Sequence, residues 1–121
     1  VRGQPRELPG EVQHALLRIA GESLFNAAAH AQARRVSVIL SYGEQRVALS
    51  VDDDGAGDPE RLRTLMKAAA HGDFASGRRR GLANMASRAA ELGGRLRIRR
   101  STLGGVRIAV EVPADDRKEL A

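Results

Sequence analysis

Acidic residues and glycines directly follow an apolar run near the middle of this 121-residue chain, at residues 51–57, Val-Asp-Asp-Asp-Gly-Ala-Gly. If the run is a strand, Asp53 lies at its end, where a carboxylate can accept a hydrogen bond from an exocyclic amine. Gly55 and Gly57 carry no side chain, so a ligand can approach their backbone closely. Acids and glycines after a strand also form ordinary turns. This pattern alone leaves both interpretations open.

Three further polar residues, Glu22, Asn26 and His30, are spaced four residues apart. Apolar residues recur at helical spacing through this segment and predict an amphipathic helix over residues 11–31. One helical turn takes about 3.6 residues, so we expect the three polar groups to point the same way. Each also has a plainer interpretation, as a solvated acid, an amide bonded to the backbone or a packing histidine.

A third candidate is the segment Gly-Leu-Ala-Asn-Met at residues 81–85, which opens a predicted helix over residues 81–92. Free N–H groups and the helix dipole favour phosphate at a helix N-terminus, so the backbone of Gly81 and Leu82 is a candidate phosphate site. Three arginines, the last of them Arg80, come directly before it, and guanidinium groups suit phosphate oxygens. The same arginines would also make an ordinary solvated surface.

The composition favours a phosphate ligand over a nucleic acid or a membrane. The 20 Lys and Arg exceed the 15 Asp and Glu, but one Tyr, two Phe and no Trp offer little for stacking bases. No apolar stretch approaches the roughly 20 residues that span a bilayer, and the chain does not begin with a signal-sequence pattern. We therefore expect a cytoplasmic location. The absence of cysteine excludes disulfides, thiolate metal sites and a cysteine nucleophile.

The length and composition predict one domain. A chain of 121 residues, of which 42% are hydrophobic, can form one core but not two. Prolines and glycines within residues 1–10 indicate a short lead-in strand or linker, and residues 114–121 resemble a charged tail. The domain is therefore placed at residues 11–113.

Alternation of apolar and polar residues predicts four strands in two hairpins. A helix over residues 58–70 and a mobile loop over residues 71–80 are predicted between the hairpins, ahead of the helix at residues 81–92. The helices are expected to cover the apolar face of the sheet. The expected fold class is α/β of the α+β kind, a two-layer sandwich with a mixed, mostly antiparallel sheet and its helices on one face. The predicted strands are residues 35–42, 46–52, 95–100 and 106–112.

These motifs, in this order, resemble those of the GHKL ATPases, in the version found in sensor histidine kinases of the nitrate-sensor type. Residues 17–31, Leu-Arg-Ile-Ala-Gly-Glu-Ser-Leu-Phe-Asn-Ala-Ala-Ala-His-Ala, are similar to the N-box helix of that family. Residues 53–57, 81–85 and 104–105 resemble the G1 box, the G2 box and the G3 turn. The resemblance covers about residues 8–113.

The resemblance implies a Bergerat ATP-binding fold that binds ATP and Mg²⁺. Asp53 would accept a hydrogen bond from the N6 amine of adenine, beside Gly55 and Gly57 of the same motif. Asn26 would ligate Mg²⁺ through its amide oxygen, since Mg²⁺ prefers oxygen ligands shared with phosphates and water. Glu22 would act in catalysis, by orienting or deprotonating the nucleophile or by binding the water shell of the metal.

The resemblance also places the triphosphate and the partners. The phosphates would lie near His30, Arg80 and the backbone of Gly81 and Leu82, with the loop at residues 71–80 as an ATP lid. The γ-phosphoryl group would pass to a histidine on a separate dimerisation domain, and a response regulator would act downstream. Only ten residues precede the first predicted helix, so we expect the phosphoacceptor elsewhere in a parent protein. No nucleic-acid partner is expected, and membrane contact is expected only through the parent.

Four positions depart from the family pattern and concern affinity more than fold. Arg79 stands where relatives usually have a glycine, Ala29 where they have Lys or Arg, and Val106 where they have Thr after the G3 glycine. Asp58 follows Gly57 directly, without the usual apolar residue between them. These departures motivate one alternative, a degenerate, non-catalytic nucleotide-binding module. The length of the chain fits another, a free-standing serine kinase of the anti-sigma-factor type.

Overall fold

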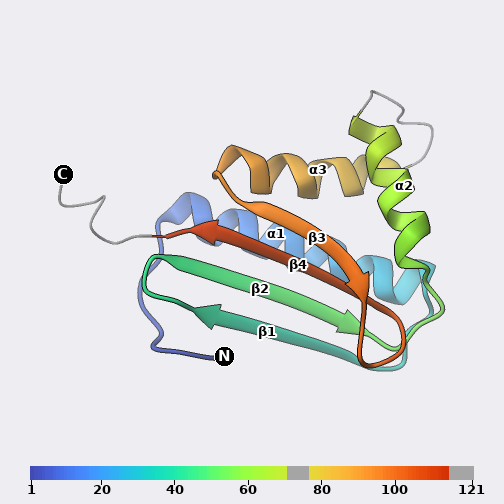
Figure 1. The fold of residues 1–121 in the computed structure, drawn as a ribbon, viewed down its shortest axis with the longest axis horizontal. Helices are drawn as coiled ribbons and strands as arrows, with labels where there is room; N and C mark the ends of the chain where they lie inside the picture. Colours follow the sequence, from blue (N-terminus) through green and yellow to red (C-terminus); the bar gives the residue numbers. More distant parts are fainter. Residues whose placement is uncertain (71–76, 115–121) are drawn as a thin grey trace.

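Helices cover one face of a single four-stranded sheet, so the protein has two layers (Figure 1), which confirms the expected α+β sandwich. The structure is a computed structural model that describes residues 1–70 and 77–114. No helix in these described ranges is long and apolar enough to cross a membrane. The elements are α1 (Gly10–Phe25), the π-helix η1 (Asn26–His30), β1 (Val36–Tyr42), β2 (Arg46–Asp53), α2 (Pro59–Ala70), α3 (Gly77–Glu91), β3 (Arg95–Arg100) and β4 (Val106–Pro113).

The strands lie in the order β1-β2-β4-β3, and every neighbouring pair is antiparallel. Each predicted hairpin is present, and the pairing of β2 with β4 joins the two. The sheet was expected to be mixed, but the parallel pairing among the described residues is limited to one bridge between Arg2 and Ser41. Backbone bonds from Arg2 to Leu40 and Tyr42 fasten the beginning of the chain along the outer edge of β1.

The core lies between the sheet and the helices, and its positions follow the expected periods. Side chains at alternate positions of β2 and β4 pack against one stripe of α1. β1 is less well covered: Val36 and Val38 share the inner face but remain 40% and 47% exposed, because β1 is an edge strand. The buried side chains of this core include Val12, Leu16, Ile19, Val47, Leu49, Val51, Ile108, Val110 and Val112.

Two helix ends follow the capping residues read from the sequence. The carboxylate of Asp58 accepts from the N–H of Glu60 at 3.0 Å, and Pro59 occupies the first position of α2. At the other end of the helical layer, α3 stops shortly before Gly93, whose φ of 73° is typical of a glycine C-cap. Local signals therefore suffice for these two boundaries.

The start of α3 differs from the prediction. We expected a helix from Gly81 after a loop at residues 71–80, but α3 begins at Gly77. The arginines after Gly77 show no apolar periodicity, so no sequence signal placed them in a helix. Arginine nevertheless has high helix propensity and readily extends a helix that is already nucleated. Residues 71–76 of the predicted loop lie outside the described residues.

The first helix also differs from the prediction, since α1 does not run to Ala31. It ends at Phe25 and continues as η1, in which the N–H of Ala31 donates to the carbonyl of Asn26 at 3.1 Å. A π-turn is wider than an α-turn, so the side chains beyond Asn26 rotate away from the line expected for an α-helix. Gln32 then takes a φ of 52°, a left-handed conformation that ends the helix.

Candidate functional site

The carboxylate of Asp53 lies at the end of β2, is 7% exposed and is held by two backbone donors. Its Oδ1 atom accepts from the N–H of Gly55 at 2.9 Å and from the N–H of Val106 at 3.2 Å. Within residues 1–70 and 77–114, no group donates to Oδ2. The protein therefore fixes the direction of this carboxylate and leaves one oxygen for another donor.

Gly105 lets the turn between β3 and β4 close over Asp53. Its N–H donates to the carbonyl of Asp53 at 3.0 Å. A Cβ atom on Gly105 would collide with the Oδ1 atom of Asp53 and would lie 2.7 Å from its carbonyl oxygen. Only glycine can occupy this position without moving the carboxylate.

The two glycines of the G1-like motif serve contacts within the protein. A Cβ atom on Gly55 would lie 2.5 Å from the carbonyl oxygen of Ala31, at the end of the first helix. A Cβ atom on Gly57 would meet the side chain of Val106 at 3.1 Å. Gly55 is thus required by close packing of the chain on itself, and Gly57 lies beside the same valine that contacts Asp53.

A buried network behind the β3–β4 turn was not predicted from the sequence. Asp52, which is 3% exposed, accepts from the Ser101 hydroxyl at 2.7 Å and from Nε of Arg107 at 2.8 Å. The Ser101 oxygen in turn accepts from the N–H of Leu103 at 3.0 Å. These bonds hold the β3–β4 turn, which donates to Asp53, against β2. The only sequence feature that pointed to this network was the serine at the start of the predicted turn between the last two strands.

Asp54 ties the end of β2 to the segment that precedes β1. Its Oδ1 atom accepts from the N–H of Arg34 at 2.8 Å and from that of Arg35 at 2.9 Å. These backbone donors, with Arg35 contributing most, hold the pKa of Asp54 below its ordinary value of 3.8. Because η1 leads into this segment, the clamp fixes Asn26 relative to Asp53.

Asn26 is the first residue of η1 and is 5% exposed. Neither its side-chain oxygen nor its nitrogen has a hydrogen-bond partner among the described residues. Leaving a buried amide unpaired costs about 1–3 kcal/mol, so few native proteins keep one without another use for it. Single π-turns are also frequent at functional sites. Asn26 is therefore the strongest indication of a ligand at this end of the helix.

Asn26 and Asp53 line one small cavity, together with Leu62 of α2 and Val106 of β4. The cavity has a volume of about 10 Å³, which is room for a water molecule and no more. The structure thus brings together the two residues singled out in separate motifs. A purine base that docks on Asp53 requires the surrounding side chains to move apart.

Glu22 points toward α3. A Cβ atom on Gly81 would collide with its Oε1 atom and would lie 2.7 Å from its Cδ. Both residues line a hollow of about 350 Å³ between α1 and α3, to which Arg18, Asn84 and Arg88 also contribute. The two arginines were not predicted, although Arg18 lies one helical turn before Glu22. A carboxylate, an amide and two guanidinium groups together can orient a polar, anionic group.

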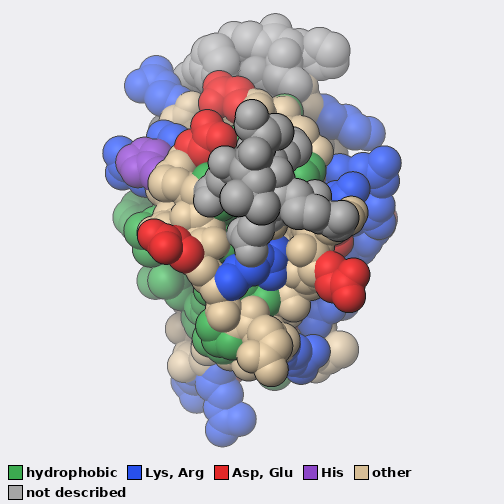
Figure 2. Space-filling view, turned by 90° about the vertical axis from the view of Figure 1, so that its left-hand side faces the viewer, with side chains coloured by type: hydrophobic (Ala, Val, Ile, Leu, Met, Phe, Trp, Pro, Cys, Tyr) green, Lys and Arg blue, Asp and Glu red, His purple; other side chains and the backbone are tan. Residues whose placement is uncertain are grey.

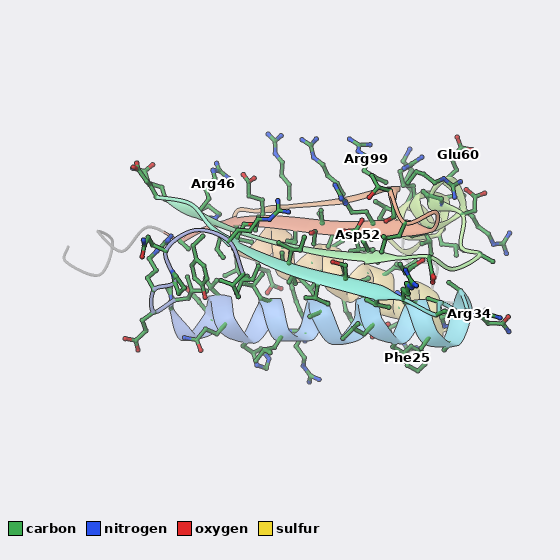
Figure 3. All side chains as sticks on the ribbon, turned by 90° about the horizontal axis from the view of Figure 1, so that it is seen from below. Phe25, Arg34, Arg46, Asp52, Glu60 and Arg99 are labelled. Atoms are coloured by element: carbon green, nitrogen blue, oxygen red, sulfur yellow. The ribbon has the colours of Figure 1, made fainter. Side chains whose placement is uncertain are left out.

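The three polar residues of the first helix do not point the same way, contrary to our expectation. Asn26 is buried and Glu22 faces α3, whereas His30 is exposed and packs edge to face on Phe25, with ring centroids 5.6 Å apart. The wider π-turn rotates His30 off the line of Glu22 and Asn26. Figure 3 shows Phe25 directed away from the sheet. His30 is therefore not brought to the cavity.

The expected phosphate-binding helix end lies one turn earlier than the sequence suggested. Because α3 begins at Gly77, the N–H groups without helical acceptors belong to its first turn, not to Gly81 and Leu82. Leu82 is fully buried in the core, and Gly81 is buried against Glu22. Arg80 is exposed.

Comparison with known proteins gives one family. The model described as "Histidine kinase-, DNA gyrase B-, and HSP90-like ATPase" matches residues 11–116. The nitrate/nitrite sensor protein NarX of Escherichia coli is 35% identical over 107 residues, which are 88% of this chain and 16% of that protein. The sensor protein kinase CarS of Pseudomonas aeruginosa is 37% identical over 100 residues, which are 81% of this chain and 22% of that protein.

A solved structure shares the fold. The ATP-binding domain of PrrB from Mycobacterium tuberculosis matches with a TM-score of 0.67 and 23% identity, over 95% of this chain and 79% of that one. At this level of identity the likeness concerns the fold alone. The chain spans about a fifth of the length of the two curated relatives.

Proposed function

This chain belongs to the histidine kinase-, DNA gyrase B- and HSP90-like ATPase family, as an ATP-binding catalytic domain of the histidine kinase type, and we propose that it phosphorylates a histidine on a separate dimerisation domain. The γ-phosphoryl group of ATP is the group transferred. A response regulator then receives it from that histidine, in the cytoplasm. The relatives named as sensors are several times longer than this chain, which leaves room in such proteins for the phosphoacceptor.

The observation that carries the proposal is the Asp53 carboxylate, fixed through Oδ1 by Gly55 and Val106, with Oδ2 left to accept. Adenine has an exocyclic amine, which donates, at the position where guanine has a carbonyl oxygen, which accepts. A carboxylate held in one direction therefore favours adenine and disfavours guanine. In this assignment Asp53 selects the base.

Asn26 fits a Mg²⁺ ligand, because its buried amide oxygen has no partner in the described chain. Mg²⁺ in nucleotide sites commonly takes one or two protein oxygens, and phosphates and water supply the rest. The described residues contain no group of three or more His, Cys, Asp and Glu that could hold a metal, so Asn26 would bind the ion jointly with the nucleotide. When bound, the ion would neutralise phosphate charge.

Glu22 would act on the incoming histidine. It lies in the hollow between α1 and α3, beside Arg18 and Arg88. A carboxylate there can accept from one N–H of an imidazole and so orient the other nitrogen toward the γ-phosphate. The two guanidinium groups suit the charge of that phosphate.

Exposed apolar side chains beside this hollow fit a helical partner. Leu17, which lines the hollow, is 72% exposed. Leu24 and Phe25, two helical turns further on, are 40% and 57% exposed. An apolar stripe on the outside of a helix is typical of a face that packs against another helix. We place the dimerisation domain on this stripe.

The test combines this chain with the histidine-bearing domain of its parent protein and with ATP labelled on the γ-phosphate. Phosphohistidine is hydrolysed by acid and survives base, whereas phosphoserine survives acid. Acid-labile label that requires Mg²⁺ and is lost in Asp53→Ala supports the proposal. Acid-stable label would identify the serine kinase instead, and ATP binding without transfer would identify a non-catalytic module.

One observation favours the non-catalytic alternative. The cavity beside Asp53 is about 10 Å³, and Val106, which lacks the hydroxyl usual at this position in relatives, lines it. Titration calorimetry with ATP, with and without Mg²⁺, measures whether the cavity opens. Affinity in the micromolar range that improves with Mg²⁺ would support the kinase, and the absence of binding would support a degenerate module.

A further inference from the structure

The outer face of the sheet carries a row of arginines that the nucleotide site does not use. Arg95, Arg97 and Arg99 alternate with apolar residues along β3, and all three are exposed. Figure 3 shows side chains that end in nitrogen, Arg46 and Arg99 among them, projecting from the sheet on the side away from α1. The end-on view in Figure 2 shows Lys and Arg on several sides of the molecule, with one group along its right-hand side.

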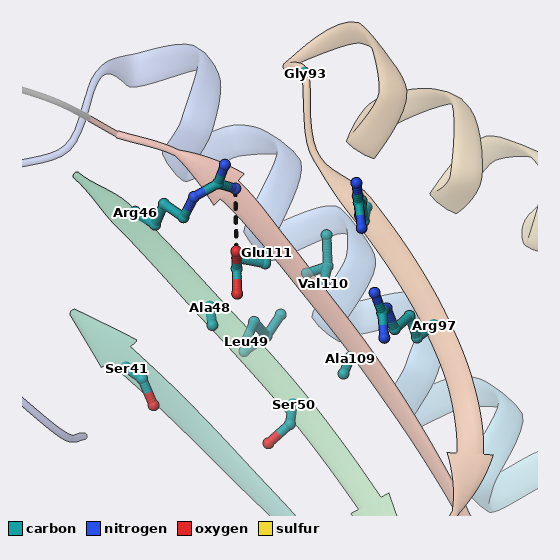
Figure 4. Close-up of a pocket in the computed structure, with 11 residues that line it drawn as sticks. Ser41, Arg46, Ala48, Leu49, Ser50, Gly93, Arg97, Ala109, Val110 and Glu111 are labelled. Carbon is teal, nitrogen blue, oxygen red and sulfur yellow. Dashed lines mark hydrogen bonds and ion pairs between the residues drawn. The ribbon is translucent and has the colours of Figure 1, made fainter. Parts of the chain in front are cut away.

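Small side chains make this face concave. Cross-strand pairing puts Ser41 beside Ala48, and Ser50 beside Ala109, on this face of the sheet. These residues line a hollow of about 700 Å³, and Arg95 and Arg97 of β3 line one side of it, with Arg97 labelled in Figure 4. An outward-facing sheet surface with bulky residues at these positions would be filled, so the hollow follows directly from the sequence of β2 and β4.

Among the described residues, Arg95, Arg97 and Arg99 form no ion pair, and Glu111, which lies opposite Arg95, pairs with Arg46. Two other arginines on this face have acidic partners: Arg46 pairs with Glu111 at 3.0 Å, and Arg107 pairs with Asp52 at 2.8 Å. No ion pair or hydrogen bond joins the three β3 arginines to any residue in the described part of the chain. Like charges at this spacing repel one another, and an anionic partner would relieve that repulsion, so the face favours binding of an anionic group.

The spacing of these arginines suits an extended polypeptide. Alternate residues of a strand lie about 6.6–6.8 Å apart, and alternate side chains of an extended partner repeat at the same distance. Carboxylates at alternate positions can therefore each meet one guanidinium group in the bidentate geometry that arginine favours. Single-stranded nucleic acid would need aromatic side chains to stack its bases, and the residues lining the hollow include none.

We propose that the basic hollow, lined by Arg95 and Arg97 over a floor that includes Ser50 and Ala109, docks an extended acidic polypeptide segment together with Arg99 further along β3. The segment lies along β3, with carboxylates at alternate positions paired to the three arginines and its backbone over the floor. Because the basic hollow and the helices lie on opposite faces of the sheet, this docking does not depend on the nucleotide function proposed above.

The test measures binding of a fluorescent peptide that alternates Glu and Thr over about eight residues to the full chain, by anisotropy. We expect binding that weakens as salt is raised, and none for the matched peptide with Gln in place of Glu. The variant R95S/R97S/R99S should bind the Glu peptide at least about tenfold more weakly. A control variant, R34S/R35S/R61S, removes the same charge elsewhere and should change the affinity by less than about threefold.

A second variant covers the case in which the triple substitution prevents folding. Ser50→Glu keeps every arginine but places a carboxylate on the floor of the basic hollow, so it should also weaken the Glu peptide by about tenfold. Equal losses in the hollow and control variants, no binding of the Glu peptide, or no effect of Ser50→Glu would overturn the proposal. Tighter binding of a single-stranded oligonucleotide, or of vesicles with anionic lipid, through the same arginines would overturn it as well.

Discussion

The two ends of the candidate nucleotide site are built in different ways. At one end, Asp53 is held by backbone N–H groups of Gly55 and Val106, where the two inner strands β2 and β4 meet. At the other end, Asn26 has no partner in the described chain, and Glu22 rests against a second helix. Hydrogen bonds within the protein already fix the Asp53 carboxylate, whereas the Asn26 amide has no partner among the described residues until a ligand supplies one. We therefore expect a preorganised base end and a phosphate end that the nucleotide completes.

Asp53→Ala should have the largest effect. Removing a charged acceptor from a buried hydrogen bond costs about 1.5–3 kcal/mol, which is roughly a tenfold to hundredfold loss of ATP affinity in calorimetry. Asp53→Asn keeps the shape but presents no carboxylate, and should lose a similar amount. Thermal unfolding of each variant serves as the control for folding. Unchanged ATP affinity in a folded Asp53→Ala protein would show that Asp53 does not select the base.

Two matched glycine substitutions compare the stiffness of the two ends directly. In Gly105→Ala the new methyl group meets the backbone and carboxylate of Asp53, which cannot yield, so stability should fall by about 1–3 kcal/mol and ATP affinity by about tenfold. In Gly81→Ala the methyl group meets only the flexible end of Glu22. Helix propensity then favours alanine by up to about 1 kcal/mol, so stability should hold or rise while phosphoryl transfer slows. Equal destabilisation of both variants would contradict the contrast.

Much of the base end could be predicted because its signals are local. An apolar strand, an acid at its end and two glycines spaced by one residue define Asp53 and its turn within seven residues of sequence. The two-layer fold followed from period-2 and helical patterns in the same way, and the caps at Asp58 and Gly93 from single residues. Each of these features depends on neighbours along the chain.

The features that the sequence did not predict depend on contacts between distant segments. The buried carboxylate of Asp52 accepts from Ser101 and Arg107, which are 49 and 55 residues away along the chain. The π-turn at Asn26 lies where the end of the first helix packs against the G1-like loop. The spacing of apolar residues in the sequence does not indicate such a turn. The start of α3 was also not predicted, because the arginines in its first turn show no apolar periodicity. Cooperative packing, and not local propensity, decides such positions.

Asn26→Ala separates a ligand from a structural residue. We expect Mg-ATP affinity to fall by roughly tenfold and metal-free ATP affinity to stay unchanged, because the amide oxygen acts only when an ion bridges it to phosphate. The free energy of unfolding should stay the same or rise by about 1 kcal/mol, since the substitution removes an unpaired buried amide. Urea denaturation and calorimetry measure the two quantities. A destabilised variant that loses both forms of ATP equally would show that Asn26 is structural.

Asp54→Asn should have the smallest effect, a small loss of stability near neutral pH that disappears in acid, and it probes the clamp that joins the two ends. The N–H groups of Arg35 and Arg34 lower the pKa of Asp54 in the folded state, so folding favours its ionised form. The carboxylate therefore stabilises the fold above its unfolded pKa, near 3.8, and this contribution is lost as the pH falls through the lower folded value. Urea denaturation at about pH 6 and about pH 3 should show a steeper acid loss for the wild type than for Asp54→Asn, which cannot lose a charge. Parallel losses in the two proteins would mean that the clamp adds nothing to the fixed relation between Asp53 and Asn26.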